Sequence, residues 1–230
     1  MLVLTSVVAL GLTALRQVTE PVAKLNEEIF EKRAILLAVE DYLGGKTVDE
    51  LSDEDVLQIF ENQVQQLVVD AEGNVIEGLK ADDVDFAQER KKPADQRKYP
   101  IWIYSNGDEK LYIVAVRGNG LWDEIWGYVA LKSDLNTVAG VAFDHKGETP
   151  GLGAEIKDNP AFREQFKGKR ILDDQGNFVG LIVRKGGARD PEHEVDAISG
   201  ATITSNGVTD MLIEGLGAYE PYFRKLRHAG

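Results

Sequence analysis

The chain has 230 residues, of which 43% are hydrophobic, enough for one sizeable core with short appendages. Asp and Glu number 39 and Lys and Arg 26, so the formal net charge is −13, which argues against binding to nucleic acid. There is no cysteine, which excludes disulfides, thiolate nucleophiles and cysteine-ligated iron–sulfur or zinc sites. The three histidines show no metal-ligand spacing, so no metal site is predicted.

The first 15 residues carry no charged side chain and are followed by Arg16. As a helix they would extend about 22 Å, less than the ~30 Å hydrocarbon core of a bilayer. A signal-peptide core, a buried helix and part of a membrane span are all compatible with this segment. Because a basic start and a cleavage site are not evident, and a charged helix follows, we predict a short or truncated membrane anchor over residues 1–16.

A helical region is predicted over residues 17–62, as a stalk followed by packing helices. Glu20-Pro21 is typical of a helix start, and apolar residues then recur at helical spacing as far as Gly44-Gly45. This pattern predicts an amphipathic helix of about 20 residues that packs on the following domain. Ser52, followed by three acidic residues, is the expected cap of a short second helix through Phe60.

Residues 63–230 show the pattern of an α+β domain with a largely antiparallel or mixed sheet and flanking helices. Asn106-Gly107 is typical of a hairpin turn, and the charged residues 80–98 are predicted to form a loop. Asp158-Asn159-Pro160 should open a short helix, and Ser205-Asn206 should cap a final helix over 207–219. Strands are expected at 66–69, 75–78, 99–104, 110–116, 126–131, 138–143 and 178–184.

Two glycine-containing loops are candidates for contact with a flat ligand. In residues 147–153 (GETPGLG), glycines on both sides of Leu152 let the backbone approach a ring, while Glu148 and Thr149 offer an acceptor and a hydroxyl. In residues 118–122, Trp122 is placed to cover an aromatic ring. Both loops are also compatible with ordinary turns and core packing, so neither pattern decides the function alone.

The segment 196–205 (DAISGATITS) runs from a strand region into the cap of the final helix. Gly200 and Ala201 keep the chain slim beside Thr202, so a large group can reach its hydroxyl. A helix that begins near Asn206 would direct free N–H groups and its positive end towards this stretch, which favours a phosphate. Composition alone favours a Ser/Thr-rich capping loop.

This segment resembles the flavinylation motif of the FMN-binding domain family, in which a flavin transferase joins FMN to a threonine through a phosphoester. The resemblance implies that Thr202 is the acceptor and that Asp196, Ser199, Gly200 and Ala201 are recognition positions around it. It further implies that Trp122, Glu148, Thr149, Leu152, Gly153 and Lys185 contact the flavin ring and phosphate, with no catalytic residue beyond the flavin itself.

Within that family, the chain resembles the C subunits of sodium-translocating NADH:quinone reductases. The residues that carry this resemblance are Gly120-Leu121-Trp122, residues 127–131, Asp134-Leu135-Asn136-Thr137 and the 147–153 loop, in that order and spacing. The G subunits of ion-translocating ferredoxin:NAD oxidoreductases share the GETPGLG and SGAT motifs. Gly-Leu-Trp together with Asp-Leu-Asn-Thr favours the quinone reductase, and the ferredoxin-linked family is the alternative.

The resemblance implies an electron carrier in a bacterial inner-membrane complex that oxidises NADH, reduces ubiquinone and transports sodium. It implies one membrane helix, with the soluble domain on the periplasmic side and the other subunits as partners. Electrons would come from an iron–sulfur centre and pass to another flavin-bearing subunit. A non-redox, membrane-anchored assembly protein that has lost its flavin remains the alternative from a different class of function.

Overall fold

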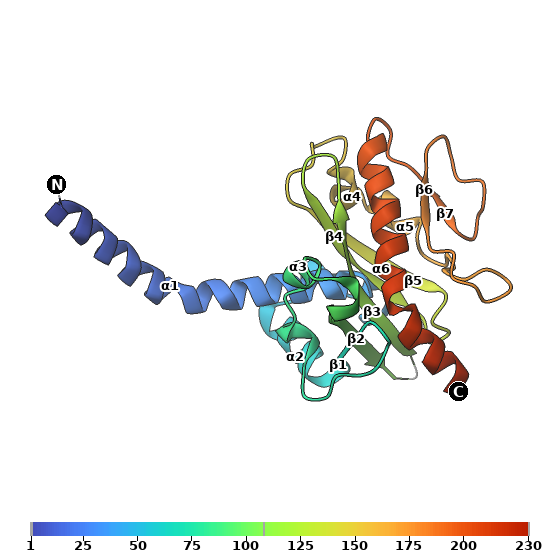
Figure 1. Cartoon of the computed structure of the whole chain (residues 1–230), viewed down its shortest axis with the longest axis horizontal. Helices are drawn as coiled ribbons and strands as arrows, with labels where there is room; N and C mark the ends of the chain where they lie inside the picture. The colour runs from blue at the N-terminus through green and yellow to red at the C-terminus, as the bar shows by residue number, and fades with distance from the viewer. Residues whose placement is uncertain (1, 108, 230) are drawn as a thin grey trace.

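The computed structural model describes residues 2–107 and 109–229, which form a five-stranded sheet, helices on both of its faces, and one long helix that projects away from it (Figure 1). That helix, α1 (Leu2–Leu37), is continuous through Pro21, so the predicted helix start at Glu20-Pro21 is wrong. A proline ring disturbs the turn that precedes it but need not end a helix, and α1 bends in its N-terminal half (Figure 1).

The first helix ends at Leu37 and not at Gly44-Gly45 as expected, whereas the short second helix forms as predicted. Two short 3₁₀ turns, η1 (Glu40–Tyr42) and η2 (Val48–Glu50), lead to α2 (Asp53–Gln63). The Ser52 hydroxyl oxygen accepts a hydrogen bond from the Asp55 N–H at 3.1 Å, which confirms the predicted cap. Among the described residues, no helix combines the length and the apolar character needed to cross a bilayer.

The sheet is an antiparallel meander whose strands are neighbours in chain order. Pairing of Asn106 with Glu109 confirms the predicted hairpin between the second and third strands. The predicted strand 75–78 is reduced to one bridge between Val69 and Val75, because the chain turns away at Gly78, where φ is +78°. The strands are β1 (Val64–Val69), β2 (Tyr99–Asn106), β3 (Glu109–Asn119), β4 (Glu124–Leu131) and β5 (Val138–His145).

The connection between β1 and β2, predicted as a loop, contains three helical turns: η3 (Ala81–Asp83), α3 (Phe86–Glu89) and η4 (Ala94–Gln96). The Asp85 carboxylate caps α3 by accepting from the Gln88 N–H at 3.0 Å. A charged segment with a proline therefore still forms local helix where a capping carboxylate is available.

The two faces of the sheet bury two separate cores. Because neighbouring residues of a strand point to opposite faces, Val114 of β3 joins the core under the last helix, with Leu212. Its neighbour Ile113 joins the core under α1 and α2, with Ile35 and Phe60. The last helix, α6, and the base of α1 therefore lie on opposite faces of one sheet.

The chain after β5 contains short elements and a second, separate sheet. Asn159 caps α5 as predicted, since its side-chain oxygen accepts from the Ala161 N–H at 3.0 Å. The predicted strand 178–184 is shorter than expected because Gly180 has a φ of +73°. The elements are α4 (Glu155–Asp158), α5 (Pro160–Glu164), β6 (Ile182–Arg184) and β7 (Glu194–Asp196), and the last two pair in parallel.

The final helix, α6 (Thr202–Ala229), begins five residues before the predicted Gly207 and continues beyond the predicted Tyr219. Ser205 is not its cap: the Ser205 hydroxyl oxygen accepts from the Ile198 N–H at 3.3 Å, in the loop before the helix. The Ala201 carbonyl accepts from the Ser205 N–H at 2.9 Å, which is the first hydrogen bond of the helix. Thr202 is therefore a helical residue and not part of a loop.

A glycine brings the start of α6 close to the sheet. A Cβ atom on Gly207 would lie 2.2 Å from the Asn119 carbonyl oxygen at the end of β3, so only glycine fits there. The second turn of α6 thereby lies beside the turn that joins β3 to β4.

Candidate functional site

Three loops meet at the N-terminal end of α6: residues 119–123, 146–154 and 197–201. The indole Nε1 of Trp122 donates to the Thr149 Oγ1 at 3.1 Å, and the Thr204 hydroxyl donates to the Glu148 Oε2 at 2.6 Å. The structure therefore brings the two glycine-containing loops and the SGAT segment together in one place.

Thr202 is the first residue of α6 and is half-exposed. Since the first intrahelical bond is donated by Ser205, the N–H groups of residues 202–204 precede the hydrogen-bonded ladder of the helix. Unpaired N–H groups and the positive end of the helix dipole favour an anion, a phosphate in particular. The sequence predicted a helix end beside Thr202, whereas the structure places Thr202 on that end.

The chain before Thr202 is slim and exposed. Gly200 has a φ of +78°, and a Cβ atom there would lie 2.8 Å from the Leu152 Cδ2. Glycine at this position therefore allows both the positive φ and the close approach of Leu152. Ser199 and Gly200 are exposed while Ala201 is buried, so solvent reaches the segment from one side.

Exposed apolar side chains surround this helix end. We call them the apolar rim, and they come from two of the loops and the first turn of α6: Leu121 (46% exposed), Trp122 (69%), Leu152 (41%) and Ile203 (57%). Free helical N–H groups beside an apolar rim suit a ligand that combines a phosphate with a flat, largely apolar ring. FMN is such a ligand, and these residues fit it.

Glu148 points into the protein. It is 4% exposed, its Oε1 accepts from the Trp122 N–H at 2.9 Å, and its Oε2 accepts from the Thr204 hydroxyl. Gly153 leaves room for this side chain, because a Cβ atom there would lie 2.2 Å from Oε2. Both carboxylate oxygens are thus bonded to protein donors.

Lys185 and Asp196 lie at the end of the β6–β7 pair. Arg184 is the Cα partner of Asp196, and Lys185 follows it as an exposed residue. Strand β6 runs beside α6 towards the N-terminal end of the helix, since Gly180 lies near Ile213 while Val183 bonds to the Thr209 hydroxyl. The Asp196 carboxylate accepts from the Ala188 N–H at 2.7 Å and so closes the loop between the two strands.

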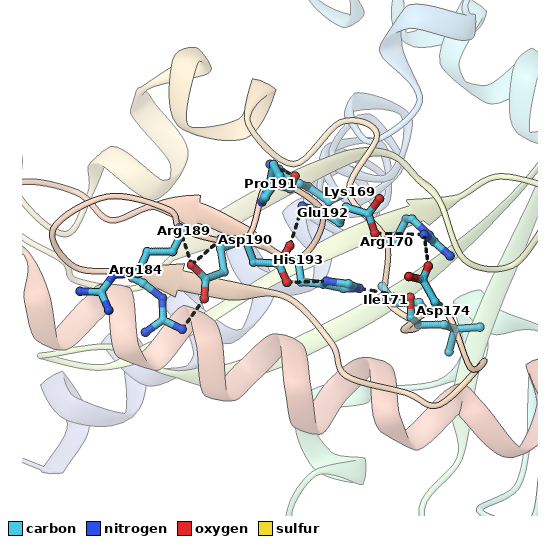
Figure 2. Close-up of polar contacts among 12 residues, drawn as sticks. Lys169, Arg170, Ile171, Asp174, Arg184, Arg189, Asp190, Pro191, Glu192 and His193 are labelled. Carbon is cyan, nitrogen blue, oxygen red and sulfur yellow. Dashed lines mark hydrogen bonds and ion pairs between the residues drawn. The ribbon is translucent and has the colours of Figure 1, made fainter.

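A network of charged residues supports this region, which we call the β6–β7 arm (residues 169–196; Figure 2). The Arg184 guanidinium pairs with Glu194, whose carboxylate also accepts from the Arg189 N–H at 2.7 Å. These bonds, that of Arg184 above all, lower the pKa of Glu194 to about 2. His193 places Nδ1 2.9 Å from the Asp190 carboxylate (Figure 2). Its Nε2 lies 3.1 Å from the Leu172 carbonyl oxygen.

A groove of about 470 Å³ lies beside the SGAT segment, between the α4–α5 region and residues 196–199. Gln165 lines it and accepts from the Asp196 N–H at 2.8 Å. No sequence pattern singles out Gln165 as a site residue, and the patterns that contain Gly120 and Thr204 assign neither of them a role. Thr204 lies two residues after Thr202 and becomes visible as a site residue only once the start of α6 is known.

A family model of the FMN-binding domain matches residues 120–217, which span the three loops and most of α6. The chain therefore contains an FMN-binding domain. It is 34% identical to the C subunit of the Na(+)-translocating NADH-quinone reductase of Neisseria meningitidis, over 100% of this chain and 91% of that protein. It is 36% identical to the corresponding protein of Vibrio anguillarum, over 76% of each chain.

Among solved structures, the C subunit of the Na(+)-translocating NADH-quinone reductase from Parabacteroides distasonis matches with a TM-score of 0.76 and 33% identity. That match covers 87% of this chain and 94% of the other. The chain belongs to the family of C subunits of Na(+)-translocating NADH-quinone reductases, an oxidoreductase complex. The predicted family is confirmed.

Proposed function

We propose that FMN is joined to the Thr202 hydroxyl by a phosphoester and that the chain relays electrons within a sodium-translocating NADH:ubiquinone reductase. The observation that carries this proposal is the place of Thr202: a half-exposed residue that begins a 28-residue helix, beside N–H groups that precede its hydrogen-bonded ladder. An ester phosphate at this position would receive hydrogen bonds and a favourable dipole without further rearrangement.

The proposed roles of the other candidate residues follow from where these residues lie. Trp122, Thr149, Leu152 and Gly153 belong to the loops beside Thr202 and are proposed to contact the ring, while exposed Lys185 is proposed to face the phosphate. Asp196, Ser199, Gly200 and Ala201 are proposed as the positions that a flavin transferase recognises. Bound FMN supplies the electron-transfer chemistry, and the chain supplies attachment, orientation and a partly open edge.

The partners are proposed from the family. The relatives are named as subunits of a reductase complex, so we propose the other subunits of such a complex as partners of this chain. We further propose that the projecting part of α1 reaches the inner membrane and leaves the domain on the periplasmic side. The side chains of Leu10, Leu12, Leu15 and Val18, each at least 61% exposed, support this proposal.

The attachment is tested by mass spectrometry of the tryptic peptide 190–224 after production with a flavin transferase. Wild type should carry the added flavin mass on Thr202, and Thr202→Val should fold but lose it. Thr202→Ser is the matched control, because it keeps a hydroxyl at the same position and should retain a large part of the label. A label that persists in Thr202→Val would place the linkage elsewhere, and an unlabelled wild type would favour the non-redox assembly role.

A further inference from the structure

A single buried carboxylate joins two of the loops to the first turn of α6. Glu148 belongs to the 146–154 loop, its Oε1 holds the backbone of Trp122, and its Oε2 holds the side chain of Thr204. Trp122 belongs to the apolar rim, and Thr204 lies two residues after Thr202 in the same helical turn. One side chain therefore connects a proposed ring contact with the turn that bears the attachment residue.

The surroundings of this carboxylate have no space for another side chain. A Cβ atom on Gly120 would lie 2.4 Å from Oε1, and one on Gly153 would lie 2.2 Å from Oε2. Heavy atoms cannot approach so closely, so a side chain at either position would displace the Glu148 carboxylate. Two glycines from two different loops thus enclose the Glu148 carboxylate.

Both groups that contact the Glu148 carboxylate are hydrogen-bond donors. The Trp122 N–H can only donate, and the Thr204 hydroxyl donates at 2.6 Å, within the range of a charge-assisted hydrogen bond. The carboxylate also lies at the first turn of α6, where the positive end of the helix dipole stabilises a negative charge. Both oxygens already accept from protein donors, and only 4% of the residue is exposed, so the carboxylate is buried away from a ligand at the surface.

We propose that Glu148 is a positioning residue, which fixes Trp122 relative to the first turn of α6 and makes no contact with the flavin. This rests on the proposed function in one respect, namely that the flavin is carried by Thr202. The link from Trp122 through Glu148 to Thr204 is itself a property of the chain without flavin, and it is measurable there.

The first measurement is hydrogen exchange of the Trp122 backbone amide by NMR in the unloaded protein. Glu148→Ala should accelerate this exchange more than tenfold, because a buried hydrogen bond to a charged acceptor is lost. Glu148→Gln should stay within about fivefold of wild type, since the amide oxygen can serve Trp122 while the amide NH₂ donates to the Thr204 oxygen. Exchange in Glu148→Ala equal to wild type would overturn the proposal.

Glu194→Ala is the matched control. Glu194 is a carboxylate of similar burial, 6% exposed, that holds backbone N–H groups of the β6–β7 arm. Loss of the Glu194 carboxylate should leave the exchange rate of the Trp122 amide within about twofold of the wild-type rate, as expected for sites without shared partners. Equal acceleration by both substitutions would assign the effect to general destabilisation and overturn the proposal.

Should Glu148→Ala fail to fold, Thr204→Val and Thr204→Ser take its place. Valine removes the donor to Oε2 with little change of shape, and serine keeps it. Thr204→Val should speed exchange of the Trp122 amide at least threefold, with Thr204→Ser close to wild type. Equal exchange in the two variants contradicts the link.

The second measurement uses the flavin-loaded chain. Glu148→Ala should keep the covalent label on Thr202 but lose more than half of the visible circular dichroism of the flavin, because the ring no longer has one fixed orientation. Glu148→Gln should keep most of it. A labelled Glu148→Ala protein with unchanged dichroism refutes the positioning role, whereas an unlabelled wild type refutes the proposed function.

Discussion

Gly200 determines how closely Leu152 can approach the chain beside Thr202. We predict that Gly200→Ala destabilises the domain by about 1–2 kcal/mol, because alanine is strained at a φ of +78°. It should also slow flavin attachment several-fold, since the new Cβ displaces Leu152 from 2.8 Å. Urea unfolding measures the first effect, and in-gel flavin fluorescence after denaturation measures the second.

Gly151→Ala separates these two effects. Gly151 also has a positive φ, +72°, but a Cβ atom there would meet no other atom within 4 Å. This variant should show the same strain in urea unfolding with a near-normal rate of attachment. Equal attachment rates in the two variants would show that contact between Leu152 and Gly200 has no part in presenting Thr202.

At the scale of elements, the stability of the β6–β7 arm depends on pH. Both ring nitrogens of His193 face acceptors, the Asp190 carboxylate and the Leu172 carbonyl, so both bonds require the imidazolium form. Burial lowers the pKa of His193, but these two bonds outweigh it and the net pKa is raised. The resulting stabilisation is complete below the unfolded value of about 6.5 and is lost as the pH rises through the raised folded pKa.

We therefore predict that His193→Gln lowers the free energy of unfolding by about 1 kcal/mol at pH 5.5 and has a much smaller effect at pH 9. Glu194 does not confuse this comparison, because a pKa of about 2 keeps it ionised throughout. Urea unfolding at the two pH values provides the measurement. His228→Gln, in the exposed last turn of α6, is the control for replacing a histidine outside the β6–β7 arm. An effect of His193→Gln that is the same at both pH values would contradict the prediction.

The sequence predicted those elements whose cause is local. The β-branched and aromatic runs of β2 to β5 lie where expected, and Ser52 and Asn159 cap the predicted helices. The start of α6 was missed because Ser205 has the side chain of a cap, yet it is used by Ile198. No local signal shows which of two competing partners a serine hydroxyl will take.

The residues of the candidate site were likewise predictable from the sequence only in part. The residues near Thr202 were identifiable from a contiguous motif, whereas the role of Glu148 depends on residues 26 positions before it and 56 after it. Its glycine neighbours, Gly120 and Gly153, also come from different loops. Such a contact exists only after β3, β4 and α6 have assembled, so spacing along the chain could not indicate it.

At the scale of the whole molecule, the sheet lies between the candidate site and the part of α1 that packs on the domain. The loops around Thr202 lie at the end of α6, which covers one face, and the base of α1 packs on the other face (Figure 1). Ile35 and Leu36 of α1 are fully buried, and Lys32 pairs with Asp82 at 2.6 Å. Farther out, Val22 and Leu25 are 61% and 46% exposed. The attachment of α1 to the domain thus depends on its last third.

This division predicts the effect of removing residues 1–25. The shortened chain keeps Ile35 and its partners, so its free energy of unfolding should change by less than about 0.5 kcal/mol. Ile35→Ala in the full chain, by contrast, should cost about 2–5 kcal/mol, because it opens a cavity under the sheet. Urea unfolding compares the two, and a shortened chain that loses more than about 2 kcal/mol would show that the projecting part supports the domain.

The same shortened chain tests the proposed contact of α1 with the membrane. Because the net charge of −13 would oppose binding to anionic lipid, zwitterionic phosphatidylcholine vesicles isolate the apolar contribution. The full chain should float with these vesicles in a density gradient, since the exposed leucines and valines of α1 gain free energy by leaving water, and the shortened chain should remain in solution. Leu10→Ser combined with Leu15→Ser should weaken flotation without changing urea unfolding, because both side chains are exposed. A full chain that stays in solution would contradict the proposed anchoring role of this helix.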